Sequence, residues 1–204
     1  LLSDSGFQGI ELDPWSLCGE RDQLRPRDVD AARRATSAAG LTITGFHWLL
    51  RRPAGLNLLS DDELVRRRSW DALRTLTRAC SDAGGSVMTI GSGPQRTREH
   101  MTRREARDVF ARELAQLVVS TQDTGVVFCI EPLPPHRSNA FNTMAEVTEV
   151  IGATGLDRVR LAYDFHNAID ETESWATLAT RYGRVTGHVH VNRPDGGCPA
   201  PHDS

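Results

Sequence analysis

The strongest constraint on the fold is a regular alternation along the chain between short apolar runs and longer segments with helical periodicity. Short runs rich in β-branched residues predict strands, and apolar residues three and four positions apart predict amphipathic helices. Strands that alternate with helices indicate a parallel sheet with right-handed crossovers. The predicted strands are 6–12, 41–50, 86–91, 126–130, 159–163 and 185–189, and the predicted helices are 26–39, 61–83, 102–121, 143–151 and 172–182.

The longest predicted helix, 61–83, has clear end signals. Ser60 is its candidate N-cap, and Gly84 with Gly85 ends it. Its expected buried face comprises Leu64, Trp70, Leu73, Leu76 and Cys80.

Two α/β architectures fit this alternation: a doubly wound open sheet and a (β/α)8 barrel. No G-x-G-x-x-G turn follows any predicted strand, which removes the usual support for a nucleotide-binding open sheet. Polar residues at successive strand ends favour a TIM (β/α)8 barrel, whose active site lies where those ends meet. Six strands cannot close such a barrel, so we expect residues 1–204 to be a single incomplete barrel domain, truncated at both ends. The polar residues at the strand ends are Glu11, His47, Ser92, Glu131, Asp164 and His190.

Three of these strand-end residues are candidate metal ligands. Glu131, Asp164 and His190 each follow an apolar run in three consecutive predicted strand–helix units. A single Asp, Glu or His at such a position is usually a turn residue, a helix cap or a hydrogen-bonded side chain. Two carboxylates and an imidazole at the same place in consecutive units instead predict a site for a divalent cation.

Composition narrows the functional classes. The net charge of −3 gives no electrostatic support for a nucleic-acid partner. All 24 basic residues are arginine, which excludes a Schiff base on lysine. No apolar stretch reaches the roughly 18 residues of a membrane span. The four cysteines form no C-x-x-C pair, and Cys80 and Cys129 lie in apolar patterns, so we expect buried free thiols and a cytoplasmic location.

Several segments resemble the xylose-isomerase-like sugar phosphate isomerase/epimerase superfamily, which includes ketose 3-epimerases, hydroxypyruvate isomerases and inosose dehydratases. The resemblance covers nearly the whole chain and is specific for fold and metal site rather than for substrate. It implies a TIM barrel with one divalent cation, most often Mn²⁺, Mg²⁺ or Co²⁺ and less often Zn²⁺. The segments are FHWLLRRPAGL (46–56), GGSVMTIGSGPQR (84–96), IEPLPPHRSNAFNT (130–143), LAYDFHNAIDE (161–171) and GHVHVN (187–192).

In that superfamily, a Glu, an Asp, a His and a second Glu from the fifth to eighth strands hold the cation. The resemblance assigns the first three positions to Glu131, Asp164 and His190, and it reads the chain as strands two to seven. The fourth ligand has no counterpart here. We expect His188 to point to the opposite side of the strand from His190, although it stays a candidate for substrate binding.

Two positions depart from the ketose 3-epimerase pattern. A substrate-binding His commonly lies three residues after the metal Asp, but here Asn167 is at that position and His166 precedes it. We expect His166 to take part in catalysis and Asn167 to bind a substrate hydroxyl. A Glu usually lies six residues after the first metal Glu, whereas this chain has Arg137, which either binds an anionic group on the substrate or is a solvated loop residue.

The resemblance implies an isomerase or epimerase that removes a proton next to a metal-bound carbonyl of a sugar or hydroxy-ketone, through an enediolate. Glu131 is the expected base. Glu11, His47 and Arg96 are candidate substrate contacts, each with a structural role as the alternative.

The alternative functions are a dehydratase of the inosose or dehydroshikimate type and a non-catalytic metal- or sugar-binding fragment. A zinc endonuclease on the same barrel would need more histidines than the seven present and a basic face. The expected partner is a small molecule, with nucleic acid and membrane excluded and a homo-oligomer left open. We expect the 204 residues alone to be inactive and the parent protein to be the enzyme.

Overall fold

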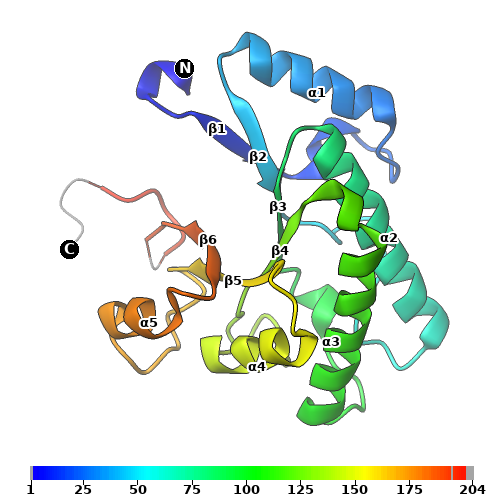
Figure 1. Ribbon diagram of the computed structural model, residues 1–204, viewed down its shortest axis with the longest axis vertical. Coiled ribbons are helices and arrows are strands. Elements are labelled where there is room, and N and C mark those ends of the chain that lie inside the picture. The colour runs from blue at the N-terminus through cyan, green and yellow to red at the C-terminus, as the bar shows by residue number, and fades with distance from the viewer. Residues whose placement is uncertain (1, 194, 201–204) are drawn as a thin grey trace.

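The computed structural model describes residues 2–193 and 195–200, and its strands form one parallel sheet. The strands follow one another in the sheet in chain order, and each neighbouring pair is parallel. They curve around the centre of the molecule with the helices on the outside (Figure 1). The strands are β1 (Gly9–Leu12), β2 (Thr42–Phe46), β3 (Val87–Ile90), β4 (Val127–Ile130), β5 (Val159–Asp164) and β6 (Thr186–His190).

One long helix follows each of the first five strands, as the alternation predicts. These helices are α1 (Pro26–Ala38), α2 (Glu63–Asp82), α3 (Arg103–Ser120), α4 (Met144–Thr154) and α5 (Trp175–Tyr182). Short 3₁₀ turns lie at Ser3–Ser5, Pro14–Leu17, Pro94–Arg96 and Gln122–Thr124. The order of elements and the parallel register confirm the predicted barrel architecture. No helix in the described ranges is long and apolar enough to cross a bilayer.

The core lies between the outer face of the sheet and the helices. An aromatic cluster joins α2, α3 and the loop after β4: the ring of Phe110 lies 5.1 Å from that of Trp70 and 4.9 Å from that of Phe141, both edge-on. Edge-to-face pairs of this kind add stability beyond the apolar area that they bury. The thiols of Cys80 and Cys129 are buried, as predicted, and Cys80 belongs to this core.

The start of α2 differs from the prediction. Asp62 rather than Ser60 is the N-cap, and its carboxylate accepts hydrogen bonds from the backbone N–H groups of Leu64 and Val65. Ser60 instead donates to Glu99 Oε1 at 3.2 Å. Leu64, expected on the buried face, is 73% exposed because it lies in the first turn of the helix, away from the sheet.

The predicted strand 41–50 is also shorter than expected. It ends at Phe46, since Trp48 has a left-handed backbone with φ of 59° that breaks the extended run. Beyond this turn Leu49 and Leu50 are buried, while Trp48 is 55% exposed. The turn thus separates His47, at the end of the sheet, from two core leucines.

Candidate active site

The carboxyl ends of the strands form one side of a cleft of about 1040 Å³. Glu131 directly follows β4, and Asp164 and His190 are the last residues of β5 and β6. Because all strands are parallel, these three ends share one edge of the sheet, where barrel enzymes bind their substrates. Other residues lining the cleft include Glu11, His47, Trp48, Arg51, His136, Arg137, His166, Asn167 and Asn192.

The three predicted metal ligands converge at this edge. One ligand atom from each of Glu131, Asp164 and His190 lies within 4.8 Å of the other two. His190 Nδ1 is 3.2 Å from Asp164 Oδ2 and 3.9 Å from Glu131 Oε1. Both carboxylates are buried, at 1% and 6% exposure. Two buried carboxylate donors and one imidazole suit a hard divalent cation.

The electrostatics of this group favour a cation. Burial alone would raise the pKa of Glu131, but the nearby imidazoles of His190 and His47 outweigh it and hold that pKa well below its usual range. Burial would likewise lower the pKa of His190, but its hydrogen bonds with Asp164 and Glu11 and the nearby Glu131 carboxylate raise it to about 11. Three carboxylates thus surround one imidazole. Their combined negative charge is an environment that stabilises a divalent cation.

Two asparagines orient the carboxylates. Asn167 Nδ2 donates to Glu131 Oε1 at 2.8 Å, and its backbone N–H donates to Asp164 Oδ1 at 2.9 Å. Asn192 Nδ2 lies 3.3 Å and 3.4 Å from the two Asp164 oxygens. Asn167 was expected to bind a substrate hydroxyl; it lines the cleft, and it also holds the carboxylates of Glu131 and Asp164 in place.

Arg96 is placed differently from the prediction that it contacts the substrate. Its side chain is fully buried and is not among the residues that line the cleft, because the 3₁₀ turn Pro94–Arg96 directs it into the interior. Its Nη1 donates to the backbone oxygens of Ile90 at 3.1 Å and Glu131 at 2.8 Å. Burial lowers the pKa of Arg96 to about 10, which leaves it charged at neutral pH. Arg96 therefore joins the ends of β3 and β4 from behind the site.

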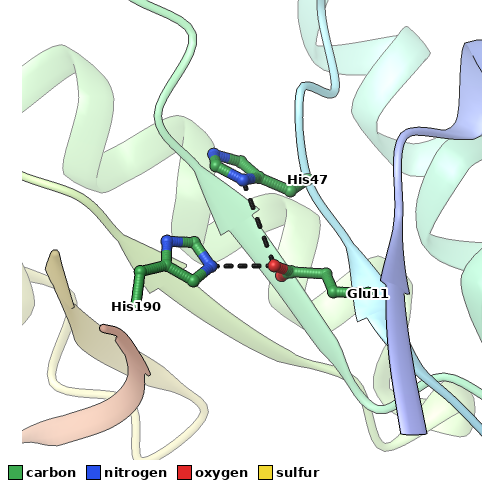
Figure 2. A group of neighbouring side chains, drawn as sticks. All are labelled: Glu11, His47 and His190. Carbon is green, nitrogen blue, oxygen red and sulfur yellow. Dashed lines mark hydrogen bonds and ion pairs between the residues drawn. The ribbon is translucent and has the colours of Figure 1, made fainter. Parts of the chain in front are cut away.

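A second group of side chains adjoins the first. Glu11, His47 and His190 also bring one ligand atom each within 4.8 Å of one another, and Figure 2 shows the Glu11 carboxylate between the two imidazoles. Glu11 Oε2 is 2.8 Å from His190 Nε2 and 4.0 Å from His47 Nδ1. His47 also approaches the first group, since its Nε2 is 3.6 Å from Glu131 Oε2.

The expected orientation of His188 is wrong. Residues two positions apart on a strand point to the same face, so His188 lies beside His190 rather than opposite it. The Nε2 atoms of the two imidazoles are 3.2 Å apart, and His188 Nε2 is 3.4 Å from Glu11 Oε1. His188 is not among the residues that line the cleft.

Arg137 and His166 lie together at the cleft wall, far from each other in sequence. Arg137 Nη2 is 2.9 Å from His166 Nε2, and a guanidinium can only donate, so the imidazole nitrogen accepts. The backbone N–H of His166 donates to Asn192 Oδ1 at 2.7 Å. Arg51 also lines the cleft. It forms an ion pair with Asp13, and its Cζ lies 5.7 Å from the Trp48 ring centre.

Sequence reasoning missed Asn192, Thr89 and Gly91. Asn192 could have been found, because it lies two residues beyond His190 and so continues the same face of the chain. Thr89 Oγ donates to Glu11 Oε1 at 3.0 Å, a contact between β3 and β1 that no local pattern predicts. Gly91 matters through the space it leaves, since a Cβ there would lie 1.7 Å from Glu131 Oε2.

Comparison with known proteins identifies a family for this chain. Residues 1–201 match the family described as xylose isomerase-like TIM barrel. A probable ketose 3-epimerase of Synechocystis sp. is 25% identical over 204 residues, which are 95% of this chain and 65% of that protein. The chain therefore spans less than two thirds of the length of this relative.

Solved structures show the same fold. The 3-keto-D-glucoside 4-epimerase of E. coli superimposes with a TM-score of 0.77 at 20% identity, over 95% of this chain and 72% of its own. A D-psicose 3-epimerase of Clostridium cellulolyticum, solved with D-tagatose, gives a TM-score of 0.77 at 16% identity, over 95% and 66%. At these identities the likeness concerns the fold.

Proposed function

Because this chain belongs to the xylose isomerase-like TIM barrel family, we propose that it carries most of the active site of a divalent-metal-dependent sugar epimerase or isomerase. The observation that carries this proposal is the convergence of Glu131, Asp164 and His190 at the floor of the large cleft. The relatives named as ketose and keto-glucoside epimerases support a sugar or hydroxy-ketone as substrate.

The donor set fits Mn²⁺, Mg²⁺ or Co²⁺. Glu131 and Asp164 supply oxygen ligands, and His190 supplies Nδ1, the ring nitrogen nearer to both carboxylates. When bound, a cation of this kind polarises a carbonyl and stabilises the negative charge that develops when a neighbouring proton is removed.

Glu131 is the proposed base. Asn167 holds its Oε1 on the side of His190, while its Oε2 lies beside Gly91 and 3.6 Å from His47 Nε2. We assign proton removal to Oε2, because the glycine leaves that oxygen room at the cleft and His47 can stabilise its charge. The depressed pKa keeps Glu131 ionised at neutral pH, as a base must be.

His166, for which the sequence predicted a part in catalysis, is hydrogen-bonded to Arg137. We propose instead that both residues contact the part of the substrate distant from the reacting carbon. They lie on the cleft wall and meet at 2.9 Å, and each lines the cleft. His47 and Asn167 lie nearer to the carboxylates and are placed to bind hydroxyl groups close to the reacting carbon.

The test is solvent-proton exchange in the full-length protein that contains this chain. With Mn²⁺ and D-fructose, D-tagatose or D-allulose in D₂O, the proposal expects deuterium at the carbon that is epimerised or next to the carbonyl, with no change in mass other than that exchange. NMR and mass spectrometry check both. Loss of one water per turnover would instead identify a dehydratase.

Variants test the metal centre separately. Glu131→Gln or Asp164→Asn should weaken Mn²⁺ binding in calorimetry and abolish deuterium exchange, because each removes a negatively charged ligand. Glu113→Gln, on α3, changes charge equally away from the cleft and should leave both readouts unchanged. Retention of full Mn²⁺ affinity by both ligand variants would contradict the assignment.

A further inference from the structure

We infer that Glu11 is a positioning residue, whose carboxylate fixes the ring of His190 so that Nδ1 faces the cation; this rests on the proposed metal centre. Glu11 Oε2 lies 2.8 Å from His190 Nε2, and the two side chains are 17% and 18% exposed (Figure 2). A carboxylate at this distance can only accept, so Nε2 carries the proton. A cation that binds would take the place of the proton on Nδ1, and the lone pair left on that atom would face the ion.

The other side of the ring agrees with this assignment. Nδ1 faces two acceptors, Asp164 Oδ2 at 3.2 Å and Glu131 Oε1 at 3.9 Å. Two carboxylates so close to Nδ1 favour a positive charge there, which a proton supplies in the absence of an ion and which a bound cation would supply in its place. The two ring nitrogens of His190 therefore have different roles: Nε2–H donates to Glu11, and Nδ1 is the atom that would bind the cation. Carboxylates that hold the second nitrogen of a ligating histidine fix its tautomer and raise its basicity.

Glu11 is itself held in place by residues of β3 and β6. Thr89 Oγ donates to its Oε1 at 3.0 Å, and His188 Nε2 lies 3.4 Å from the same oxygen. Each carboxylate oxygen thus has its own partners, and Oε2 is left to His190. Hydrogen bonds with His188 and His190 outweigh burial, which would raise the pKa of Glu11, and they keep that pKa far below its usual range.

The same geometry excludes a second role for His190. Glu11, His47 and His190 also form a ligand group, but it uses Nε2 of His190. A neutral imidazole has one lone pair, so Nδ1 and Nε2 cannot both bind an ion. The structure therefore assigns one cation per chain to this end of the sheet, with Glu11 outside its ligand sphere.

Mn²⁺ and Co²⁺ binding to the full-length protein tests the inference. Glu11→Ala should weaken Mn²⁺ binding by roughly 10- to 100-fold in calorimetry, with the stoichiometry unchanged at one ion. Glu11→Gln should lose less, because its amide oxygen still accepts from Nε2–H. Glu20→Ala, which removes an exposed acidic side chain near the end of the first 3₁₀ turn after β1, is the matched control and should bind like the wild type.

Three outcomes would overturn the inference. The first is unchanged affinity in Glu11→Ala, and the second is a wild-type stoichiometry of two ions that falls to one. The third is a shift of the Co²⁺ absorption bands of saturated Glu11→Ala, which would make Glu11 a ligand. Thr89→Val removes only the support of Glu11 and should weaken binding in the same direction, which keeps the test valid if Glu11→Ala does not fold. A wild type that binds no Mn²⁺ would instead contradict the proposed metal centre itself.

Discussion

At the scale of single residues, Gly91 decides where the carboxylate of Glu131, the first proposed metal ligand, can lie. Glu131 follows β4, yet its carboxylate leans toward the end of β3, where a Cβ on Gly91 would come within 1.7 Å of Oε2 and 2.9 Å of Cδ. Both contacts are far shorter than a van der Waals distance. The glycine is thus required by a close approach rather than by a turn.

Gly91→Ala should displace the Glu131 carboxylate and lower kcat/KM of the full-length protein by roughly 100-fold, as expected for a misplacement of about 1 Å at a reacting group. Deuterium exchange into the ketose measures this loss. Gly152→Ala is the matched control, since a Cβ at this position of α4 meets no atom within 4 Å and helices favour alanine over glycine. Equal activity of the two variants would contradict this role for Gly91.

At the scale of elements, sequence periodicity predicted the type and order of strands and helices but missed ends that depend on distant contacts. Ser60 and Asp62 are both good caps, and the choice is made by Glu99, which accepts the hydroxyl of Ser60. Similarly, the apolar run 41–50 resembles one strand. It stops early at the left-handed turn of Trp48, and beyond this turn the Leu49 carbonyl accepts from the Trp15 indole at 2.9 Å, across 34 residues of sequence.

The candidate site could likewise be predicted where it depends on the order of the strands, but not where it depends on contacts between distant residues. The convergence of Glu131, Asp164 and His190 follows from the alternation, because parallel strands bring their carboxyl ends together. The interior position of Arg96 depends on a 3₁₀ turn whose direction no local pattern gives. Contacts such as that between Thr89 and Glu11 join strands 78 residues apart and need the assembled sheet.

Asp62→Ala should lower the free energy of unfolding by about 1 kcal/mol, because two backbone N–H groups at the start of α2 lose their acceptor. Urea unfolding followed by circular dichroism measures the change. Asp71→Ala, in the middle of the same helix with its side chain 58% exposed, should stay within about 0.5 kcal/mol of the wild type. An equal loss in both variants would argue against the cap.

At the scale of the whole molecule, the interior can be tested through its thiols. Cys18, Cys80 and Cys129 are buried, and Cys198 is exposed. Burial raises the pKa of Cys80 and of Cys129 to about 12, so both are protonated at pH 8. The reactive thiolate form is therefore nearly absent from the interior.

Native protein at pH 8 should show one fast-reacting thiol of these four with a chromogenic disulfide reagent, and all four in urea. Cys198→Ser should remove the fast phase. A fast phase that persists in this variant would mean that the interior opens readily, contrary to the packing described above.

The 204-residue chain by itself is predicted to lack turnover. Within the described residues β1 and β6 each pair with one neighbour only, so the two edges of the sheet meet through side chains rather than through backbone hydrogen bonds. We expect no deuterium exchange from this chain and weaker Mn²⁺ binding than in the full-length protein. Efficient epimerisation by the isolated chain would contradict the prediction.

The contact between Glu11 and His190 has a consequence for how the protein folds. These residues are 179 positions apart, so their contact closes nearly the longest loop available in the chain. Contacts of such separation form late, because the entropy of loop closure is lost before the contact is gained. The proposed cation site is therefore complete only once the sheet is complete. A metal that binds only the native state stabilises it by about 2.7 kcal/mol when its free concentration is 100 times its Kd. A cation bound at this site would therefore favour the native state over partly folded states.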